Sequence, residues 1–98
     1  MFIKGTARDS FNARDEAVRL TRTHGRALGL ILTGRGCTIT YRDGNVYETQ
    51  HLIGGYSGTG PNCAAETLVA LGFEKDLSTA LAKTTQEGGN SHYSVYGD

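Results

Sequence analysis

Residues 28–53 read LGLILTGRGCTITYRDGNVYETQHLI, and this stretch contains three strand-like segments separated by two turns. The first segment is a short apolar run, and the second is rich in Thr, Ile and Tyr, which favour β-structure. Asp43-Gly44 between the second and third segments is a strong hairpin signal, because both residues tolerate the positive φ of a tight turn. The segments span residues 28–33, 37–42 and 46–53. The stretch therefore predicts an antiparallel β-meander.

The register of this meander is not fixed by the sequence. Strand residues alternate between two faces, and one of these faces must be buried. Leu30 and Ile39 are the expected members of the buried face, together with either Val46 or Tyr47.

Helical patterns flank the meander on both sides. Asn12 is a candidate N-cap for a helix over residues 13–23, although the alternation through Val18, Leu20 and Arg22 leaves a strand as the competing interpretation. Past the meander, apolar spacing predicts a helix that starts at Pro61 and ends at Gly72, followed by a second helix over about residues 74–86.

The two ends of the sequence alternate weakly. Residues 2–7 predict a short edge strand, and Tyr93, Val95 and Tyr96 belong to a final strand, a subunit contact or a disordered tail. No internal repeat or long linker interrupts the sequence. Residues 1–98 are therefore predicted to form a single α+β domain, a small antiparallel β-meander of about three to five strands packed with two or three short helices.

Composition narrows the classes of partner. Ten basic residues balance ten acidic ones, so we do not expect a broad electrostatic attraction to nucleic acid or to a membrane. A chain of 98 residues buries a modest share of its surface, which makes a homo-oligomer the expected state. No apolar run is long enough for a membrane span or signal peptide, and we expect a cytoplasmic protein.

The cysteines and the carboxylates predict no catalytic or metal chemistry. Cys37 and Cys63 lack the spacing of a zinc site, and in a cytoplasmic protein two reduced thiols are favoured over a disulfide. The acidic residues are explained by solvated helix faces and helix N-termini. We therefore predict a protein without metal or cofactor that is not an enzyme.

Four of the seven residues from Gly54 to Gly60 are glycine, and Pro61 follows directly. Glycines let the backbone approach a ligand, and the free N–H groups of a helix start attract phosphates. The spacing does not fit a Walker loop, a dinucleotide fingerprint or a nucleophile elbow. A simple tight turn is the alternative.

We predict that this loop binds a nucleotide-type ligand. Tyr56 offers a stacking face, hydroxyl and amide groups offer hydrogen bonds, and arginines in the meander turns offer phosphate contacts. The turn that contains Arg35 is expected at the loop's end of the sheet, whereas Arg42 would contribute across a dimer. The candidate ligand-binding residues are Gly55, Tyr56, Ser57, Gly58, Thr59, Gly60, Asn62, Arg35 and Arg42.

The stretch 54–61, with the short helix that ends at Leu71-Gly72-Phe73, resembles small phage proteins that sequester cyclic nucleotide signals, the anti-Thoeris sponge type. The resemblance covers about 20 of the 98 residues. It implies a non-enzymatic α+β oligomer whose pockets, often at subunit interfaces, enclose a cyclic ADP-ribose-like or cyclic oligonucleotide signal without cleaving it. For a phage-encoded protein the site of action would be the host cytoplasm.

A small inhibitor or immunity protein is the rival hypothesis. Such a protein would block the surface of a protein partner, and tyrosine is common at the centre of such interfaces. In that case the interface anchors would be Tyr41, Tyr47, Tyr93 and Tyr96.

Overall fold

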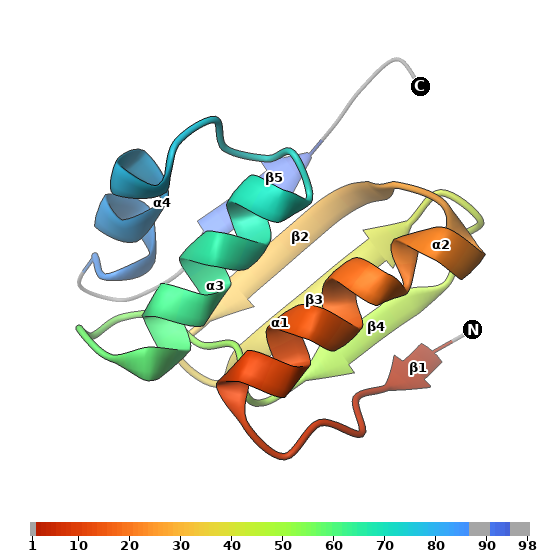
Figure 1. The fold of residues 1–98 in the computed structure, drawn as a ribbon, viewed down its shortest axis with the longest axis horizontal. Helices are drawn as coiled ribbons and strands as arrows, with labels where there is room; N and C mark the ends of the chain where they lie inside the picture. The colour runs from red at the N-terminus through yellow and green to blue at the C-terminus, as the bar shows by residue number, and fades with distance from the viewer. Residues whose placement is uncertain (1, 87–90, 95–98) are drawn as a thin grey trace.

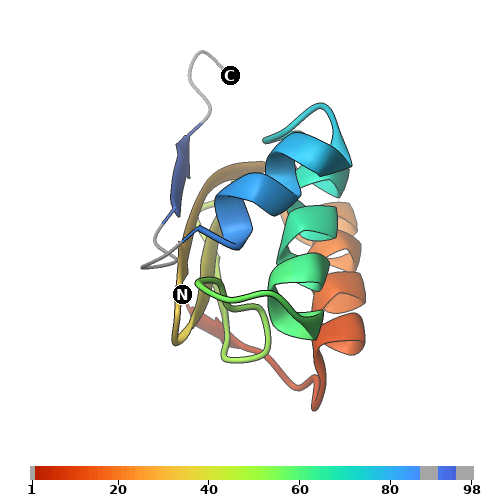
Figure 2. The same cartoon turned by 90° about the vertical axis from the view of Figure 1, so that its left-hand side faces the viewer.

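A computed structural model describes residues 2–86 and 91–94, with only the backbone of the last four. A five-stranded sheet forms one layer, and all the helices lie on one of its faces (Figures 1 and 2). The strands are β1 (Phe2–Lys4), β2 (Ala27–Thr33), β3 (Gly36–Tyr41), β4 (Val46–Thr49) and β5 (Ser91–Ser94). The helices are α1 (Ser10–Arg19), α2 (Thr21–His24), α3 (Thr59–Ala70) and α4 (Leu77–Thr84). The predicted α+β class is confirmed.

Strands β2, β3 and β4 form the predicted antiparallel meander. Ile39 pairs with Leu30 on one side and with Tyr47 on the other, so these three residues share one face. That face is buried, and Val46 lies on the opposite, partly exposed face. Strand β4 ends at Thr49, four residues earlier than predicted.

Two further strands extend the meander, and the sheet order is β1-β4-β3-β2-β5. The predicted N-terminal edge strand exists, but it runs parallel to β4, which makes the sheet mixed. Strand β5 pairs antiparallel with β2 and includes the backbone of Tyr93. The prediction for Val95 and Tyr96 lies outside the described residues.

The N-terminal segment is helical, and the strand interpretation of residues 18–22 is wrong. Helix α1 begins before the predicted start because Asp9, not Asn12, is the N-cap: the Asp9 carboxylate accepts from the Asn12 backbone N–H at 2.8 Å. A short second helix follows and ends at Gly25, whose φ of 84° favours glycine.

The C-terminal helices are shifted relative to the predictions. Helix α3 begins at Thr59, and Pro61 is its third residue, a position that needs no intrahelical N–H donor. Helix α4 is shorter than predicted, because Asp76 caps it by accepting from the Thr79 N–H at 2.8 Å. No helix in the described part of the chain has the length and apolarity needed to cross a membrane.

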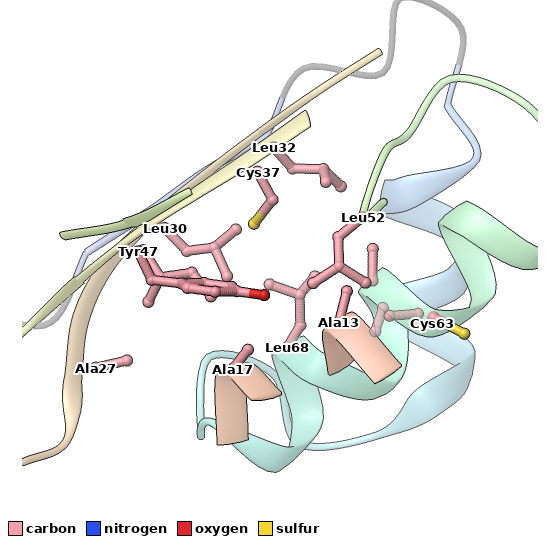
Figure 3. Close-up of a cluster of buried hydrophobic side chains, with 14 of the residues drawn as sticks. Ala13, Ala17, Ala27, Leu30, Leu32, Cys37, Tyr47, Leu52, Cys63 and Leu68 are labelled. Atoms are coloured by element: carbon pink, nitrogen blue, oxygen red, sulfur yellow. The ribbon is translucent and has the colours of Figure 1, made fainter. Parts of the chain in front are cut away.

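Two buried tyrosines connect the sheet to α1. The Tyr41 hydroxyl donates to the Ala17 carbonyl at 2.6 Å, and the Tyr47 hydroxyl donates to Glu16 Oε1 at 2.7 Å. Figure 3 shows Tyr47 extending from the sheet toward α1. Both tyrosines are 0% exposed, so their predicted role as interface anchors is wrong. Nothing is described of the Tyr93 side chain or of Tyr96.

The Glu16 carboxylate also holds the segment that follows β1. It accepts from the Thr6 backbone N–H at 3.1 Å and from the Thr6 hydroxyl at 2.6 Å. Partial burial raises the pKa of Glu16, but the hydrogen bonds from Thr6 and Tyr47 outweigh this effect and leave the pKa below its ordinary value. Glu16 therefore links α1, β4 and the β1–α1 connection.

We expect Tyr41→Phe to lower the free energy of unfolding by about 1–3 kcal/mol, because the buried Ala17 carbonyl loses its donor. Urea denaturation of the whole chain measures this change. Tyr56→Phe is the matched control, since Tyr56 is 46% exposed, and its effect should stay within about 0.5 kcal/mol. Equal losses in the two variants would contradict the role assigned to Tyr41.

The stabilisation from Glu16 should depend on pH. A folded-state pKa below the unfolded value stabilises the protein above the unfolded pKa, and this contribution disappears as the pH falls through the folded value. The stability difference between wild type and Glu16→Gln should therefore be full near neutral pH and shrink in acid. Urea midpoints measured from about pH 7 to about pH 3 test this. A difference that is constant or grows in acid would contradict it.

Candidate functional site

The glycine loop is anchored to the sheet and to a helix. The Gly54 N–H donates to the Thr33 carbonyl at the end of β2 at 3.0 Å, and the Gly55 N–H donates to the Thr84 carbonyl of α4 at 2.9 Å. Gly55 has a φ of 95°, which favours glycine. The start of the loop therefore has a defined place beside the β2–β3 turn.

Two of the loop glycines make room for a side chain of the same loop. A Cβ atom added at Gly58 would lie 2.7 Å from Cε2 of Tyr56, and one added at Gly60 would lie 2.8 Å from the Tyr56 hydroxyl and 2.7 Å from Cγ1 of Ile53. Tyr56 thus folds back over the start of α3. Gly58 and Gly60 are therefore explained by packing against Tyr56 and Ile53, and neither has the positive φ that a tight turn would require of glycine.

The helix start is less open to an anion than the sequence predicts. Gly58 is the N-cap of α3 and has no side chain to donate or accept. Pro61 lies in the first turn without an N–H, and Gly60 is buried. Thr59 and Asn62 line a different hollow, on the outer side of the helices. The predicted ligand-binding residues therefore do not form one site.

The two predicted arginines lie at opposite ends of the sheet. Arg35 is in the β2–β3 turn, as expected beside the loop, and its backbone N–H donates to Thr33 Oγ1 at 3.1 Å. Arg42 lies at the other end, where its N–H donates to the Arg26 carbonyl at 2.9 Å and its side chain packs beside Gly25. Within one chain, Arg42 does not join the glycine loop.

A hollow of about 510 Å³ lies beside the turn that contains Arg35, and Arg35 is one of its lining residues. The register places four of its lining residues in one row across the sheet, opposite to the core face: Lys4 pairs with Glu48, Glu48 with Thr38, and Thr38 with Ile31. The lining also includes Thr33, Thr49, Gln50 and His51. The hollow therefore combines two cations, an imidazole and one carboxylate with several neutral hydrogen-bonding groups.

The cations of this hollow are available to a ligand. Among the described residues, the Arg35 guanidinium and the Lys4 ammonium make no hydrogen bond or ion pair. Sequence reasoning missed Lys4 and His51. Lys4 joins the hollow only because β1 pairs in parallel with β4, a contact between distant segments that no local motif indicates.

The described residues include an imidazole–carboxylate pair, His24 with Asp43, but it lies far from the loop. His24 Nδ1 and Asp43 Oδ2 are 2.7 Å apart, at the end of the sheet where the β3–β4 turn lies. The Asn45 backbone N–H first, and then His24, hold the pKa of Asp43 at about 2. This pair is at the wrong end of the sheet to activate Ser57.

Both cysteines are buried and unpaired. Burial raises the pKa of the Cys37 thiol to about 12, which suppresses the reactive thiolate. In residues 2–86, His, Cys, Asp and Glu side chains do not gather in groups of three suited to a metal ion.

Comparisons of the chain with protein-family models, with curated proteins and with solved structures found no match.

A double-mutant cycle tests whether Gly58 serves Tyr56. Gly58→Ala should lower the free energy of unfolding by about 1–3 kcal/mol through overpacking, and Tyr56→Ala in the same chain should remove most of that loss. Gly60→Ala is the matched control: its added methyl group still meets Ile53 when Tyr56 is truncated, so rescue should be incomplete. Chemical denaturation measures all the variants. Independent, additive losses at Gly58 and Tyr56 would contradict the packing explanation.

Proposed function

We propose that this protein binds a nucleotide-type ligand at the hollow around Arg35 and sequesters it without turnover. The observation that carries the proposal is Arg35, which lies on a short turn, lines a hollow of about 510 Å³ and makes no side-chain hydrogen bond or ion pair with the residues that the structure describes. Such a volume is within the usual range of small-molecule sites. The glycine loop supports this turn through the hydrogen bond from Gly54 to Thr33.

The chemistry of the hollow suits an anionic, hydroxyl-rich ligand. Arginine binds phosphate with a planar fork of donors, and the Lys4 ammonium adds a second cation. Thr33, Thr38 and Gln50 can exchange hydrogen bonds with ribose hydroxyls or base edges. Ile31, 44% exposed, offers an apolar surface for part of the ligand.

Sequestration without cleavage is the activity that fits these groups. The proposed site combines cations with neutral donors, and its one carboxylate, Glu48, has no second acid beside it for acid–base chemistry among the lining residues. The choice of a cyclic nucleotide signal within the ligand class rests on the sequence resemblance of residues 54–61. Action in the cytoplasm and self-association belong to the same proposal.

Thermal unfolding with a panel of cyclic nucleotides tests the proposal. A ligand that binds only the folded chain adds about 2.7 kcal/mol at 100 times its Kd, which raises the Tm of a domain of this size by roughly 10 °C or more. Arg35→Gln should weaken binding about tenfold or more, since charge-assisted hydrogen bonds contribute about 1.5–3 kcal/mol each. Arg22→Gln, an exposed arginine beside the far end of the sheet, should leave binding unchanged.

Two results would overturn the proposal. No Tm shift with any member of the panel would exclude a nucleotide ligand of the classes tested. Binding that survives Arg35→Gln but is lost in Tyr56→Ala would move the site to the glycine loop. Chromatography of the ligand after release from heated protein distinguishes sequestration from turnover, because a sequestered ligand is recovered intact.

A further inference from the structure

The helical layer has a groove on its outer side, away from the sheet. Its floor is the outer face of α3, with Asn62, Cys63 and Glu66. Phe11 of α1 borders the groove on one side, and Leu77 and Leu81 of α4 border it on the other. Figure 1 shows α3 lying between α1 and α4. The groove has a volume of about 360 Å³ and follows about two turns of α3, over residues 59–66.

Large apolar side chains border this groove and remain exposed. Phe11 is 54% exposed and Leu77 is 44% exposed, although each belongs to a helix whose other face packs into the core. Ala80 and Thr84 of α4 are fully buried, so α4 is firmly placed. The exposure of Leu77 is therefore not a consequence of a loosely packed helix. Apolar pairs that flank a helical floor suit the apolar side of another helix.

The charges around the groove are mainly negative. Burial raises the pKa of the Cys63 thiol, the charges of Glu66, Asp9 and Asp15 raise it further, and Arg14 opposes them. Three carboxylates thus act on the floor of the groove against one guanidinium. Arg14 is already engaged, since its guanidinium lies 3.1 Å from both Asp15 Oδ1 and Glu66 Oε1 and 5.6 Å from the centre of the Phe11 ring.

The helix ends near the groove do not reverse this sign. The N-terminus of a helix contributes about half a positive charge. Asp9 caps α1 and Asp76 caps α4, and each places a full negative charge at its helix end. The α3 N-terminus, capped by Gly58, has no acidic residue in its first turn and keeps its half charge, which is smaller than the charge of Glu66 one to two turns along the same helix. The chain as a whole has a formal net charge of zero, so the negative excess is local to this surface.

From these observations we propose that the groove docks a basic amphipathic helix of a protein partner. The apolar side of that helix covers Phe11, Leu77 and Leu81, and its lysines or arginines face Asp9, Asp15 and Glu66. This surface is separate from the hollow around Arg35, and the proposal does not depend on a nucleotide ligand.

Two synthetic helical peptides of about four turns test the proposal. Both have leucine at the i, i+3, i+4 and i+7 positions, and the remaining positions are lysine in one and glutamate in the other. Titration of the full chain with the lysine peptide should shift the backbone NMR signals of Phe11, Cys63 and Leu81. The glutamate peptide should bind at least about tenfold more weakly than the lysine peptide, and added salt should weaken the binding of the lysine peptide.

Matched variants locate the contact. Phe11→Ser and Leu77→Ser should each weaken the binding of the lysine peptide about tenfold or more, because each removes an apolar side chain that the peptide buries. Ile31→Ser is the control: Ile31 is also 44% exposed, but it lies on the open face of the sheet. Arg35→Gln should leave peptide binding unchanged. Circular dichroism verifies folding, and Leu77→Ser decides the test if Phe11→Ser does not fold.

Three outcomes would overturn the proposal. The first is the absence of binding by the lysine peptide. The second is a lack of selectivity, seen either as equal binding of the two peptides or as an equal loss of lysine-peptide affinity in Ile31→Ser and Leu77→Ser. The third is self-association of the chain that Leu77→Ser abolishes, which would make a second copy the occupant of the groove. Light scattering without peptide measures that association.

Discussion

The side chains of Tyr41 and Tyr47 extend from the sheet to α1, and the hydroxyl group of each donates a hydrogen bond to that helix. The arrangement of the helical layer on the sheet depends on these two hydrogen bonds. A buried hydroxyl needs a partner, and the Ala17 carbonyl belongs to the last turn of α1, where carbonyls lack an intrahelical donor. Each group therefore satisfies the other. Tyr47 reaches Glu16, which in turn holds Thr6. The Glu16 carboxylate thus holds α1 on the sheet through Tyr47, and through Thr6 it positions the segment that follows β1, so that β1 lies at the edge beside β4.

Local signals were enough to predict the meander and the two C-terminal helices, because the turn at Asp43-Gly44 and the apolar spacing are properties of neighbouring residues. They left residues 13–23 open between helix and strand, since Val18, Leu20 and Arg22 also alternate. The register needed tertiary information: Val46 and Tyr47 are both good strand residues, and only burial against α1 selects Tyr47. The parallel pairing of β1 also joins distant segments, and it brings Lys4 to Glu48. The sequence could therefore predict Arg35 as a candidate from the topology of the meander, but it could not predict Lys4, the second cation of the same hollow.

The glycine loop shows why a pattern of glycines does not identify a ligand site. Glycine permits any group to approach the backbone, and a side chain of the same loop is the nearest group available. Tyr56 packs over Gly58, and together with Ile53 it packs over Gly60. Tyr56, which we predicted to stack on a base, thus explains why glycine is needed at positions 58 and 60. The loop contributes to the proposed ligand site only indirectly: the Gly54 N–H holds the end of β2, where the turn that contains Arg35 begins.

The formal net charge of zero is the sum of local excesses of opposite sign. Lys4 and Arg35 outnumber Glu48 in the hollow at the sheet, whereas three carboxylates outnumber Arg14 at the groove on the helices. A two-layer domain buries one face of each layer and leaves the other face of each layer in solvent. Ligands of opposite charge can therefore be recognised on the two sides of one small chain, and screening over about 10 Å at 0.1 M salt weakens the effect of each surface on a ligand at the other. Net charge governs the attraction of the whole chain to a distant polyanion. A net charge of zero therefore excludes neither the ligand site at the hollow nor the docking site at the groove, because each site acts on its ligand at short range.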